Sequence, residues 1–317
     1  MPLGSSSTSE DVMANIDLTD TVAVVTGGYR GLGRETARAL AASGAAVTIA
    51  GRDAERLASA AAELSSAGPV EVEVLQLDLS DQSSVEAAAA SFAGRHNRLD
   101  LLINNAGIMG CDFELSVDGH ELQLATNHLG HFTLTNRLTP LLVAAAPSRV
   151  VNLSSAGHRA SDIVWDDPHF SERPYDKWAA YGQAKTANVL HVVGLQARLG
   201  PRGVDAFAVM PGMIFTALGR HLTEADIAEL TTKTAASSDG PGITSKSVAA
   251  GAATTLWCAT APSLTGHGGV YCEDCAVAEP SDRAGAGLGY EPYAVDPAAA
   301  ERLWELSESM LASRADR

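Results

Sequence analysis

Short apolar, β-branched runs alternate along the chain with longer segments that favour helix. The short runs predict buried parallel strands, because a strand covered on both faces is apolar throughout. Strands that alternate with helices predict one doubly wound parallel sheet. The expected strands are residues 21–26, 46–50, 72–77, 99–103, 149–155, 204–210 and 268–272, and the main expected helices are 34–43, 54–64, 119–146, 176–199 and 297–313.

This alternation predicts an α/β fold of about seven strands in the order 3-2-1-4-5-6-7, flanked by helices on both faces. A chain of 317 residues is long enough to bury such a core in one domain. The polar, Ser-rich residues 1–17 are expected to be a flexible arm, and residues 18–317 a single domain. Substrate loops are expected at about 158–180 and 213–247, before the C-terminal helix 297–313.

Composition and charge narrow the class of protein. The formal net charge of −16 argues against nucleic-acid and anionic-membrane partners, because both would repel this surface. No apolar run reaches about 18 residues, and no charged-then-apolar leader opens the chain, which favours a cytoplasmic protein. Cys272-x-x-Cys275 lacks a second ligand pair, and His128 and His131 lack a third ligand, so no metal site is expected.

A glycine-rich turn follows the first predicted strand. Residues 27–33 read Gly-Gly-Tyr-Arg-Gly-Leu-Gly, and the helix-forming stretch 34–43 comes directly after them. Strand, glycine turn and helix bring backbone N–H groups and a helix N-terminus against a pyrophosphate, and glycines let the ligand approach closely. This context predicts a dinucleotide site and therefore a sheet of the Rossmann type.

The end of the second strand bears on which dinucleotide binds. An NAD-preferring site usually offers a carboxylate there for the ribose hydroxyls, but residues 51–53 read Gly-Arg-Asp. Arg52 can pair with a 2′-phosphate, and Arg30 in the glycine turn is a second candidate. Asp53 has an alternative role as the N-cap of the next helix. The sequence therefore favours NADP(H), with NAD(H) possible, and Asp78 at the third strand end is placed to meet the adenine.

Tyr181 and Lys185 lie four residues apart in the predicted helix 176–199. Residues at this spacing share one helix face, so the phenol and the ammonium project together. A nearby cation favours phenolate, and Lys185 is therefore expected to lower the pKa of Tyr181 from its usual ~10. Tyr181 is a candidate general acid or base that exchanges a proton with a carbonyl or alcohol oxygen. The pair alone is a weak signal, since many helices carry a Tyr and a Lys on one face.

Polar and small residues follow the other predicted strands. Asn104-Asn-Ala-Gly107 follows the fourth, Ser154-Ser155 the fifth and Pro211-Gly212 the sixth. Such residues suit the crevice at the carboxyl ends of the strands, where cofactors lie in these sheets. Asn127 is unusual inside a predicted helix, because its amide competes for backbone hydrogen bonds. An exposed asparagine with no function is the alternative for that position.

Together these motifs closely resemble the short-chain dehydrogenase/reductase family over residues 18–275. The resemblance rests, in chain order, on Thr26-Gly27-x-x-x-Gly31-x-Gly33, Asn104-Asn105-Ala106-Gly107, Asn127, Ser155, Tyr181 with Lys185, and Pro211-Gly212. Two stretches are similar to its retinol-dehydrogenase-like branch, which includes the oxidoreductase domain of the WW-domain oxidoreductase. They are Asn127-His-Leu-Gly-His-Phe132 and Val151-Asn-Leu-Ser-Ser-Ala-Gly-His158.

The resemblance implies hydride transfer between a nicotinamide and a carbonyl or alcohol carbon. It implies that Tyr181 donates or accepts the proton, that Ser155 hydrogen-bonds the same oxygen, and that Lys185 holds the nicotinamide ribose. Asn127 would hold a water that completes the proton relay. The implied cofactor contacts are Gly27, Tyr29, Arg30, Gly31, Leu32, Gly33, Arg52, Asp78, Leu79, Asn105, Ala106, Gly107, Tyr181, Lys185, Pro211, Gly212, Ile214 and Thr216. A moderately large apolar substrate is expected, with Trp165, Trp178, Met213, Phe215 and Leu218 as candidates for the pocket wall.

Three alternatives stay open. Sugar-nucleotide epimerases and dehydratases share Tyr-x-x-x-Lys, but their glycine spacing is normally G-x-x-G-x-x-G. Reduction of an activated C=C bond is the second alternative, within the same family. A cofactor-binding sensor or scaffold without turnover is the third, and it predicts loss of Ser155, Tyr181 or Lys185, all of which are present. Many relatives pair through the two long helices, here 119–146 and 176–199, so a homodimer is also expected.

Overall fold

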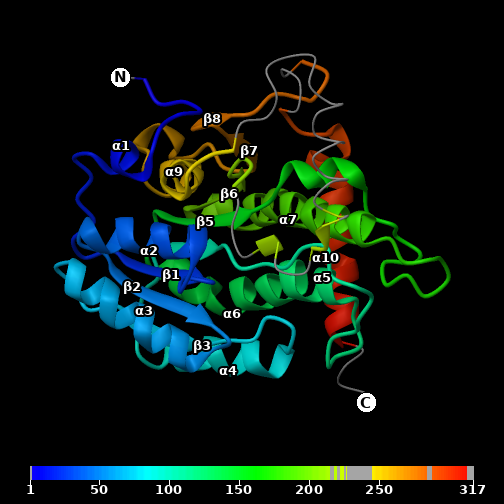
Figure 1. Ribbon diagram of the computed structural model, residues 1–317, viewed down its shortest axis with the longest axis horizontal. Helices are drawn as coiled ribbons and strands as arrows, with labels where there is room; N and C mark the ends of the chain where they lie inside the picture. The colour runs from blue at the N-terminus through cyan, green and yellow to red at the C-terminus, as the bar shows by residue number, and fades with distance from the viewer. Residues whose placement is uncertain are drawn as a thin grey trace.

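The computed structural model of the chain describes residues 2–214, 218–219, 222–224, 226, 245–283 and 288–312. These residues form an eight-stranded sheet in the order β3-β2-β1-β4-β5-β6-β7-β8 (Figure 1). Every strand pair from β3 to β7 is parallel, and β8 is antiparallel to β7. The predicted order is confirmed, and the two-residue β8 is an addition that the sequence did not predict. The strands are β1 (Val22–Thr26), β2 (Ala46–Gly51), β3 (Glu73–Gln76), β4 (Leu101–Asn104), β5 (Ser148–Leu153), β6 (Val204–Met210), β7 (Val270–Glu273) and β8 (Ala276–Val277).

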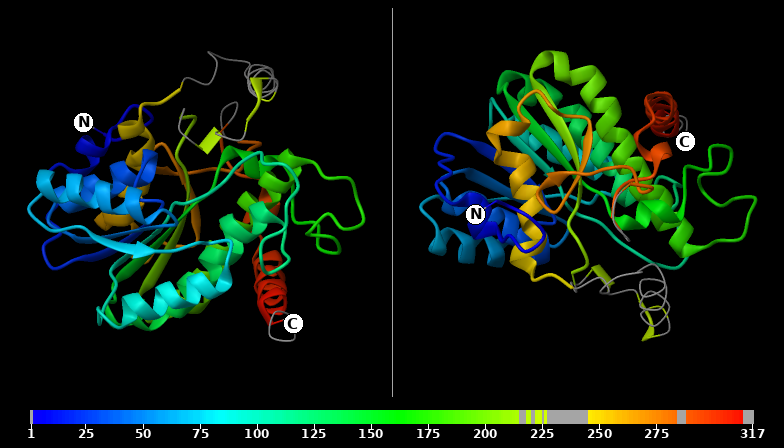
Figure 2. Two further views of the ribbon diagram at one scale, coloured as in Figure 1. Left: turned by 60° about the horizontal axis from the view of Figure 1, so that its bottom comes forward. Right: turned by 90° about the horizontal axis from the view of Figure 1, so that it is seen from above.

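Helices cover both faces of the sheet (Figure 2). One face packs against α2 (Gly31–Ala42), α3 (Ala54–Ala67) and α9 (Val248–Thr260). The opposite face packs against α4 (Gln82–Ala93), α6 (Gly130–Ala144) and α7 (Lys177–Leu199). Val24 and Val25 on β1 are both fully buried, and they belong to the clusters on opposite faces. Successive strand side chains point to opposite faces, which explains why the strands are apolar throughout.

Aspartates fix where three helices begin. Asp53 caps α3 by accepting a hydrogen bond from the backbone N–H of Arg56, so its predicted capping role is confirmed. Asp81 caps α4, and Asp176 caps α7 by accepting from the N–H groups of Trp178 and Ala179. Each cap satisfies donors that have no partner within the helix. The cap at Asp176 fixes the start of the helix that carries Tyr181 and Lys185.

The helix predicted over residues 119–146 is not continuous. It consists of a short turn α5 (Leu122–Leu124), a π-helix η1 (Ala125–Leu129) and then α6. Asn127 lies in η1 and is fully buried, so the alternative of an exposed asparagine is wrong. Its amide Nδ2 donates to Ile108 O, and its Oδ1 accepts from Ile108 N. A π-turn widens the helix locally, and such turns are frequent at functional sites.

The N-terminal segment differs from the flexible arm predicted over residues 1–17. Residues Ser9–Met13 form helix α1, whose N-terminus is closed by a capping box between Thr8 and Asp11. The apolar side chains of Val12 and Met13 are buried in the cluster that also contains α9. A five-residue helix is too short to show a period in the sequence, and its stability comes from this packing.

The C-terminal helix α10 (Pro297–Ala312) crosses α7 (red in Figure 1). Its Leu303 is buried with Leu190 of α7, and its Trp304 ring stands edge-on to Phe132 of α6 at 4.7 Å. This helix therefore covers part of the surface of the two long helices that was expected to pair with a second copy, and that pairing stays a prediction. No helix in the described part of the chain is long and apolar enough to cross a membrane.

Candidate functional site

The predicted site residues follow the carboxyl ends of three neighbouring strands. Gly27 follows β1, Asn105 follows β4 and Ser155 lies two residues beyond β5. These strands are hydrogen-bonded neighbours, so their carboxyl ends meet at one edge of the sheet. The helix α7 brings Tyr181 and Lys185 to the same edge, because α7 packs against β5, β6 and the turn that follows Ser155.

Tyr181 and Ser155 form the centre of the site. The Tyr181 side chain is buried, with 5% of its surface exposed, and it lies close enough to Ser155 for the serine hydroxyl to lower its pKa. The Ser155 hydroxyl also accepts a hydrogen bond from Gly157 N at 3.0 Å and so caps the 3₁₀ turn η2 (Ala156–Ala160). A Cβ atom at Gly157 would lie 2.7 Å from Cε1 of Tyr181. Glycine there lets the turn pack directly on the phenol ring, which fixes the ring beside Ser155.

The expected lowering of the Tyr181 pKa by Lys185 is wrong for this structure. Burial raises the pKa of Tyr181 to about 12, and the neighbour that lowers it is the Ser155 hydroxyl. Burial disfavours the charged phenolate more than the neighbouring Ser155 hydroxyl stabilises it. Lys185 Nζ lies 5.7 Å from the centre of the phenol ring and donates to Leu153 O at 2.9 Å. Tyr181 is therefore a protonated phenol at neutral pH and can act as a proton donor.

Lys185 is brought together with Asn127 and Gly107. A Cβ atom at Gly107 would lie 3.0 Å from Asn127 Oδ1 and 3.6 Å from Lys185 Nζ. The loop after β4 therefore lies close to both side chains, and a larger residue at Gly107 would crowd the Asn127 amide oxygen. Burial lowers the pKa of Lys185 to about 8. The group is thus still mainly an ammonium at pH 7, but it gives up its proton more easily than an exposed lysine.

This shift predicts how stability depends on pH. Between pH 8 and about 10.5 the unfolded chain holds a proton on Lys185 that the folded chain has lost, so the free energy of unfolding rises with pH. Between pH 7 and pH 9.5 we expect the free energy of unfolding of the wild type to rise by about 2 kcal/mol relative to that of Lys185→Met. Urea unfolding of both proteins at the two pH values measures the difference. A difference that stays constant with pH would contradict the assignment.

His131 and Thr26 lie beside the predicted site residues, although the sequence predicted no role at the site for either of them. His131 Nδ1 donates to the backbone O of Asn127 at 3.0 Å, and its Nε2 faces Thr26 Oγ1 at 2.9 Å. Thr26 Oγ1 in turn accepts from the backbone N–H groups of Asn105 and Ala106. Burial lowers the pKa of His131 to about 4, so the ring is neutral and links Asn127 to the end of β1. The signal in the sequence is that His131 comes four residues after Asn127, which puts the His131 ring within reach of the Asn127 carbonyl on one side of the helix.

The glycine turn fits the pyrophosphate of a dinucleotide. Gly27 and Gly31 adopt φ values of +69° and +53°, which other residues rarely adopt. A Cβ atom at Gly33 would lie 2.5 Å from Gly27 O, so the start of α2 lies directly against the turn. Arg30 is the N-cap of α2 and forms no side-chain cap bond, which leaves the first N–H groups of the helix for a ligand. Asn105 supports the turn, because its Nδ2 donates to Thr26 O at 2.7 Å.

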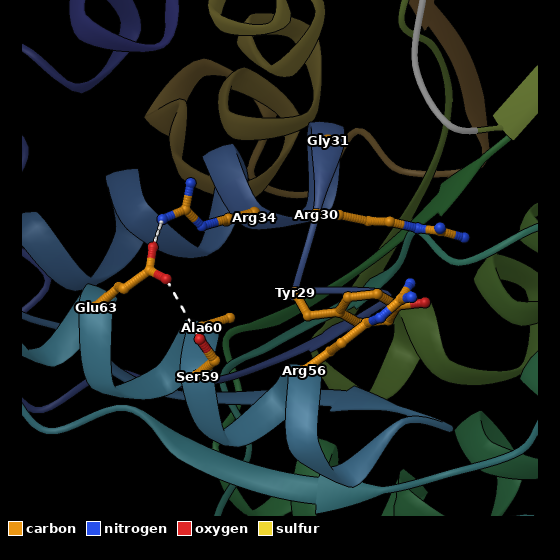
Figure 3. Close-up of a pocket in the computed structure, with 8 residues that line it drawn as sticks. All are labelled: Tyr29, Arg30, Gly31, Arg34, Arg56, Ser59, Ala60 and Glu63. Carbon is orange, nitrogen blue, oxygen red and sulfur yellow. Dashed lines mark hydrogen bonds and ion pairs between the residues drawn. The ribbon is translucent and has the colours of Figure 1, made fainter.

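A cavity of about 420 Å³ opens between the start of α2 and the side of α3 (Figure 3). The Arg30 guanidinium lies 5.2 Å from the centre of the Tyr29 ring, and Arg56 extends in the same direction as both (Figure 3). Arg34 points away from them and pairs with Glu63. The residues that line the cavity are Tyr29, Arg30, Gly31, Arg34, Arg56, Ser59, Ala60 and Glu63. Arg56, Arg34 and Ser59 were not among the predicted contacts.

The comparisons with known proteins agree with this geometry. The sequence model of the short chain dehydrogenase family matches residues 21–227. The chain belongs to the short-chain dehydrogenase/reductase family. It is 41% identical over 313 residues to short-chain dehydrogenase/reductase prx1 of Penicillium roqueforti, covering 96% of this chain and 90% of that protein. It is 39% identical over 301 residues to retinol dehydrogenase 12 of Homo sapiens, covering 95% and 89%, and it lies in the retinol-dehydrogenase-like branch.

A solved structure of the same fold holds a nucleotide. It is the active-site complex of Pseudomonas aeruginosa RhlG with NADP, and it shares 27% identity with this chain at a TM-score of 0.64. The match covers 81% of this chain and 95% of that one. As a short-chain dehydrogenase/reductase, this chain is an oxidoreductase of a family that uses NAD(P) and acts on small molecules.

The structure also places the other predicted cofactor contacts that it describes. Arg52 is 63% exposed, and its Nη1 lies 4.0 Å from a carboxylate oxygen of Asp78. The Leu79 side chain is buried in the core, where it packs against Gly130 of α6, and its contact with the cofactor stays a prediction. Leu32 and Ile214 meet at Gly251 of α9, which ties the segment after β6 to the glycine turn. Pro211 and Gly212 precede Ile214, and Gly212 has a φ of +98°.

The predicted pocket wall is only partly assembled within the described residues. Trp178 packs on Gly110 together with Leu222, a residue that the sequence analysis did not name. Trp165 instead packs with the cluster of α7 and α10, and Arg302 of α10 lies 4.5 Å from the centre of its ring. Its place in the pocket wall stays a prediction. Met213 and Leu218 are half-buried, and Phe215 and Thr216 lie outside the described residues.

Buried polar groups near Trp178 hold the loop after β4. The Tyr175 hydroxyl has two acceptors within reach of its one proton, Glu121 Oε1 at 3.1 Å and Cys111 O at 3.2 Å. Gln123 accepts from Gly110 N and donates to Lys177 O. Burial raises the pKa of the Glu121 carboxyl. All four cysteines are buried thiols, and no group of three or more His, Cys, Asp or Glu residues in the described part of the chain could hold a metal ion.

Proposed function

We propose that this protein is an NADP(H)-dependent oxidoreductase that interconverts a carbonyl and an alcohol on a moderately large apolar substrate. The observation that carries the proposal is the buried Tyr181–Ser155 pair beside Lys185 and Asn127. A bound nicotinamide would supply or accept the hydride. Ser155 orients the substrate oxygen by a hydrogen bond, and Tyr181 donates the proton to it when a carbonyl is reduced. In the alcohol direction Tyr181 accepts the proton.

Lys185 and Asn127 support this proton transfer. The pKa of Lys185, lowered to about 8, lets it exchange a proton near neutral pH. Asn127 is held by two hydrogen bonds to Ile108, and both Asn127 and Lys185 lie close to Gly107. We infer that a water held near Asn127 passes protons between solvent and Lys185.

The preference for NADP(H) rests on cations near the glycine turn. Arg30 and Arg52 are candidates to pair with a 2′-phosphate, and Arg56 reaches in the same direction as Arg30 (Figure 3). Guanidinium groups bind phosphate by paired hydrogen bonds. Asp53, the carboxylate that follows β2, caps α3 and pairs with Arg56. Its oxygens are therefore already engaged and are not free to bind the ribose hydroxyls of NAD(H). The NADP complex of the related RhlG supports the same choice.

The proposal that the substrate is apolar rests on the side chains around Trp178. Trp178 and Leu222 pack together at Gly110. The loop that follows Gly110 exposes Phe113, Leu115 and Val117, and the Phe113 ring lies 5.2 Å from the ring of Tyr175. Apolar side chains that remain in water beside a site favour an apolar ligand.

A substrate panel tests the function. Aldehydes, ketones and enones of increasing size and apolarity are incubated with NADPH and NADH in parallel, and the loss of reduced cofactor is followed. We expect carbonyl reduction with NADPH to rise with substrate apolarity and to be absent in Tyr181→Phe. Turnover of the enone C=C bond alone would favour the alternative C=C reductase. Cofactor binding with no turnover in either direction would favour a sensor or scaffold.

A further inference from the structure

His158 occupies a fully buried position between the catalytic turn and the C-terminal segment. Its Nδ1 lies 2.7 Å from the backbone O of Ser155, and its Nε2 accepts from the backbone N of Glu291 at 3.1 Å. Ser155 and Glu291 are more than a hundred positions apart in the chain, so the imidazole is a bridge that only the fold creates. The proposed mechanism does not use His158, and packing alone would not need a side chain that forms hydrogen bonds on two sides of its ring.

The partners of the ring fix its tautomer. A backbone N–H can only donate, so Nε2 must carry the lone pair that accepts from Glu291. Nδ1 must then carry the proton that is donated to Ser155 O. Burial lowers the pKa of His158 to about 4, with Arg159 adding to the effect and Glu291 opposing it. The ring is therefore neutral at pH 7, and both of its nitrogens are satisfied.

The backbone of His158 is held as firmly as its ring. Its carbonyl O accepts from Tyr293 Oη at 2.8 Å and from Thr186 Oγ1 at 3.0 Å. Thr186 belongs to α7, one position after Lys185, so the turn is joined to the catalytic helix as well as to the C-terminal segment. The Tyr181 ring packs on Gly157, the neighbour of His158. A shift of this turn would therefore move Ser155 and Tyr181 relative to each other.

We propose that His158 is a positioning residue for Ser155, through which the segment 291–293 holds the catalytic turn in place. The inference rests on the proposed function, because positioning matters only if Ser155 and Tyr181 act on a substrate oxygen. The bond from Nδ1 fixes the Ser155 carbonyl and therefore the direction of the Ser155 hydroxyl, which caps the same turn through Gly157 N. Small errors in such a geometry cost turnover more than they cost cofactor binding.

The tautomer is tested on the wild-type protein without any substrate. Nitrogen-15 NMR of labelled histidines distinguishes Nδ1–H from Nε2–H, and the signal that is missing in both His158→Asn and His158→Gln identifies the residue. We expect a neutral Nδ1–H ring whose shifts do not change between pH 5.5 and pH 8. An Nε2–H tautomer, or titration within this range, would overturn the proposal whatever the activity of the enzyme.

Three substitutions separate the two hydrogen bonds. His158→Phe keeps the ring and loses both bonds, His158→Asn keeps an N–H near the position of Nδ1, and His158→Gln keeps an acceptor near the position of Nε2. We expect His158→Phe and His158→Gln to lower kcat about 10- to 30-fold, with cofactor affinity changed less than about twofold. His158→Asn should recover most of kcat, because it keeps the bond to Ser155. If His158→Phe does not fold, the other two variants and the NMR result still decide the question.

Ser307→Ala is the matched control for stability. It removes another buried hydrogen bond of a histidine, that between Ser307 Oγ and His128 Nε2 at 2.8 Å, on α10. We expect it to lower Tm without lowering kcat. Loss of kcat in every variant in proportion to its loss of Tm would show that His158 is structural only. An active wild type with an inactive Tyr181→Phe protein and an unaffected His158→Phe protein would overturn the positioning role and leave the proposed function intact.

Discussion

Tyr181→Phe is expected to lower kcat by about 10³- to 10⁴-fold while the dissociation constant of the cofactor changes less than about twofold. The substitution removes one oxygen from a side chain that is 5% exposed, and the ring can keep its contact with Gly157. The substitution removes the hydroxyl that donates the proton in the proposed mechanism. Initial rates with the best carbonyl substrate give kcat, and quenching of protein fluorescence gives the affinity for NADPH.

Tyr271→Phe is the matched control for this prediction. The same atom is removed from another buried tyrosine, whose hydroxyl has no hydrogen-bond partner among the described residues. Because no bond is lost, turnover should remain near that of the wild type. A Tyr181→Phe protein that keeps full turnover would refute the mechanism, and equal losses in both variants would point to an effect on folding.

Arg52→Ala is expected to weaken NADPH binding by about 100-fold and to leave NADH binding within about threefold. The reason is that only NADPH offers a 2′-phosphate, and a charge-assisted pair with a guanidinium is worth about 1.5–3 kcal/mol. Arg52 is mostly exposed and lies 4.0 Å from Asp78, so little folding energy depends on it. Titration of both cofactors against wild type and variant measures the ratio.

Arg137→Ala is the control for loss of one exposed arginine. Arg137 is 60% exposed and pairs with Glu86, far in sequence from the glycine turn. We expect it to leave the affinities for both cofactors unchanged. Arg56→Ala is informative in addition, because Arg56 reaches in the same direction as Arg30 (Figure 3). If Arg52→Ala weakened NADH as strongly as NADPH, the 2′-phosphate assignment would be wrong.

The fold could be predicted from the sequence because its signals are local. Apolar runs such as residues 204–210 became strands, since a strand buried on both faces needs no other information. The capping role of Asp53 and the glycine turn at residues 27–33 also follow from local backbone geometry. The helix that carries Tyr181 and Lys185 was foreseen for the same reason, and α-helical spacing alone places the two residues on one face.

The environment of the site was decided only by the tertiary structure. Whether the pKa of Tyr181 rises or falls depends on burial and on where Lys185 finds its acceptor, and that acceptor is Leu153 O, 32 positions away. The π-helix places the Asn127 amide beside the loop that contains Ile108, and the amide forms two hydrogen bonds with the backbone of Ile108. The roles of His131 and His158 likewise require partners distant in the chain.

The sequence by itself determined the strands and helices, the nucleotide turn and the types of residue proposed to do the chemistry, because these depend on neighbours within a few positions. The sheet order followed from the alternation of strands and helices, since crossover connections between parallel strands are right-handed. Only the tertiary structure decided the protonation of Tyr181, the placement of Trp165 on α10, and the bridge from Ser155 through His158 to Glu291. The physical reason is that burial and hydrogen bonding are sums over contacts in space. Contacts between segments separated by a hundred residues leave no period or spacing in the chain.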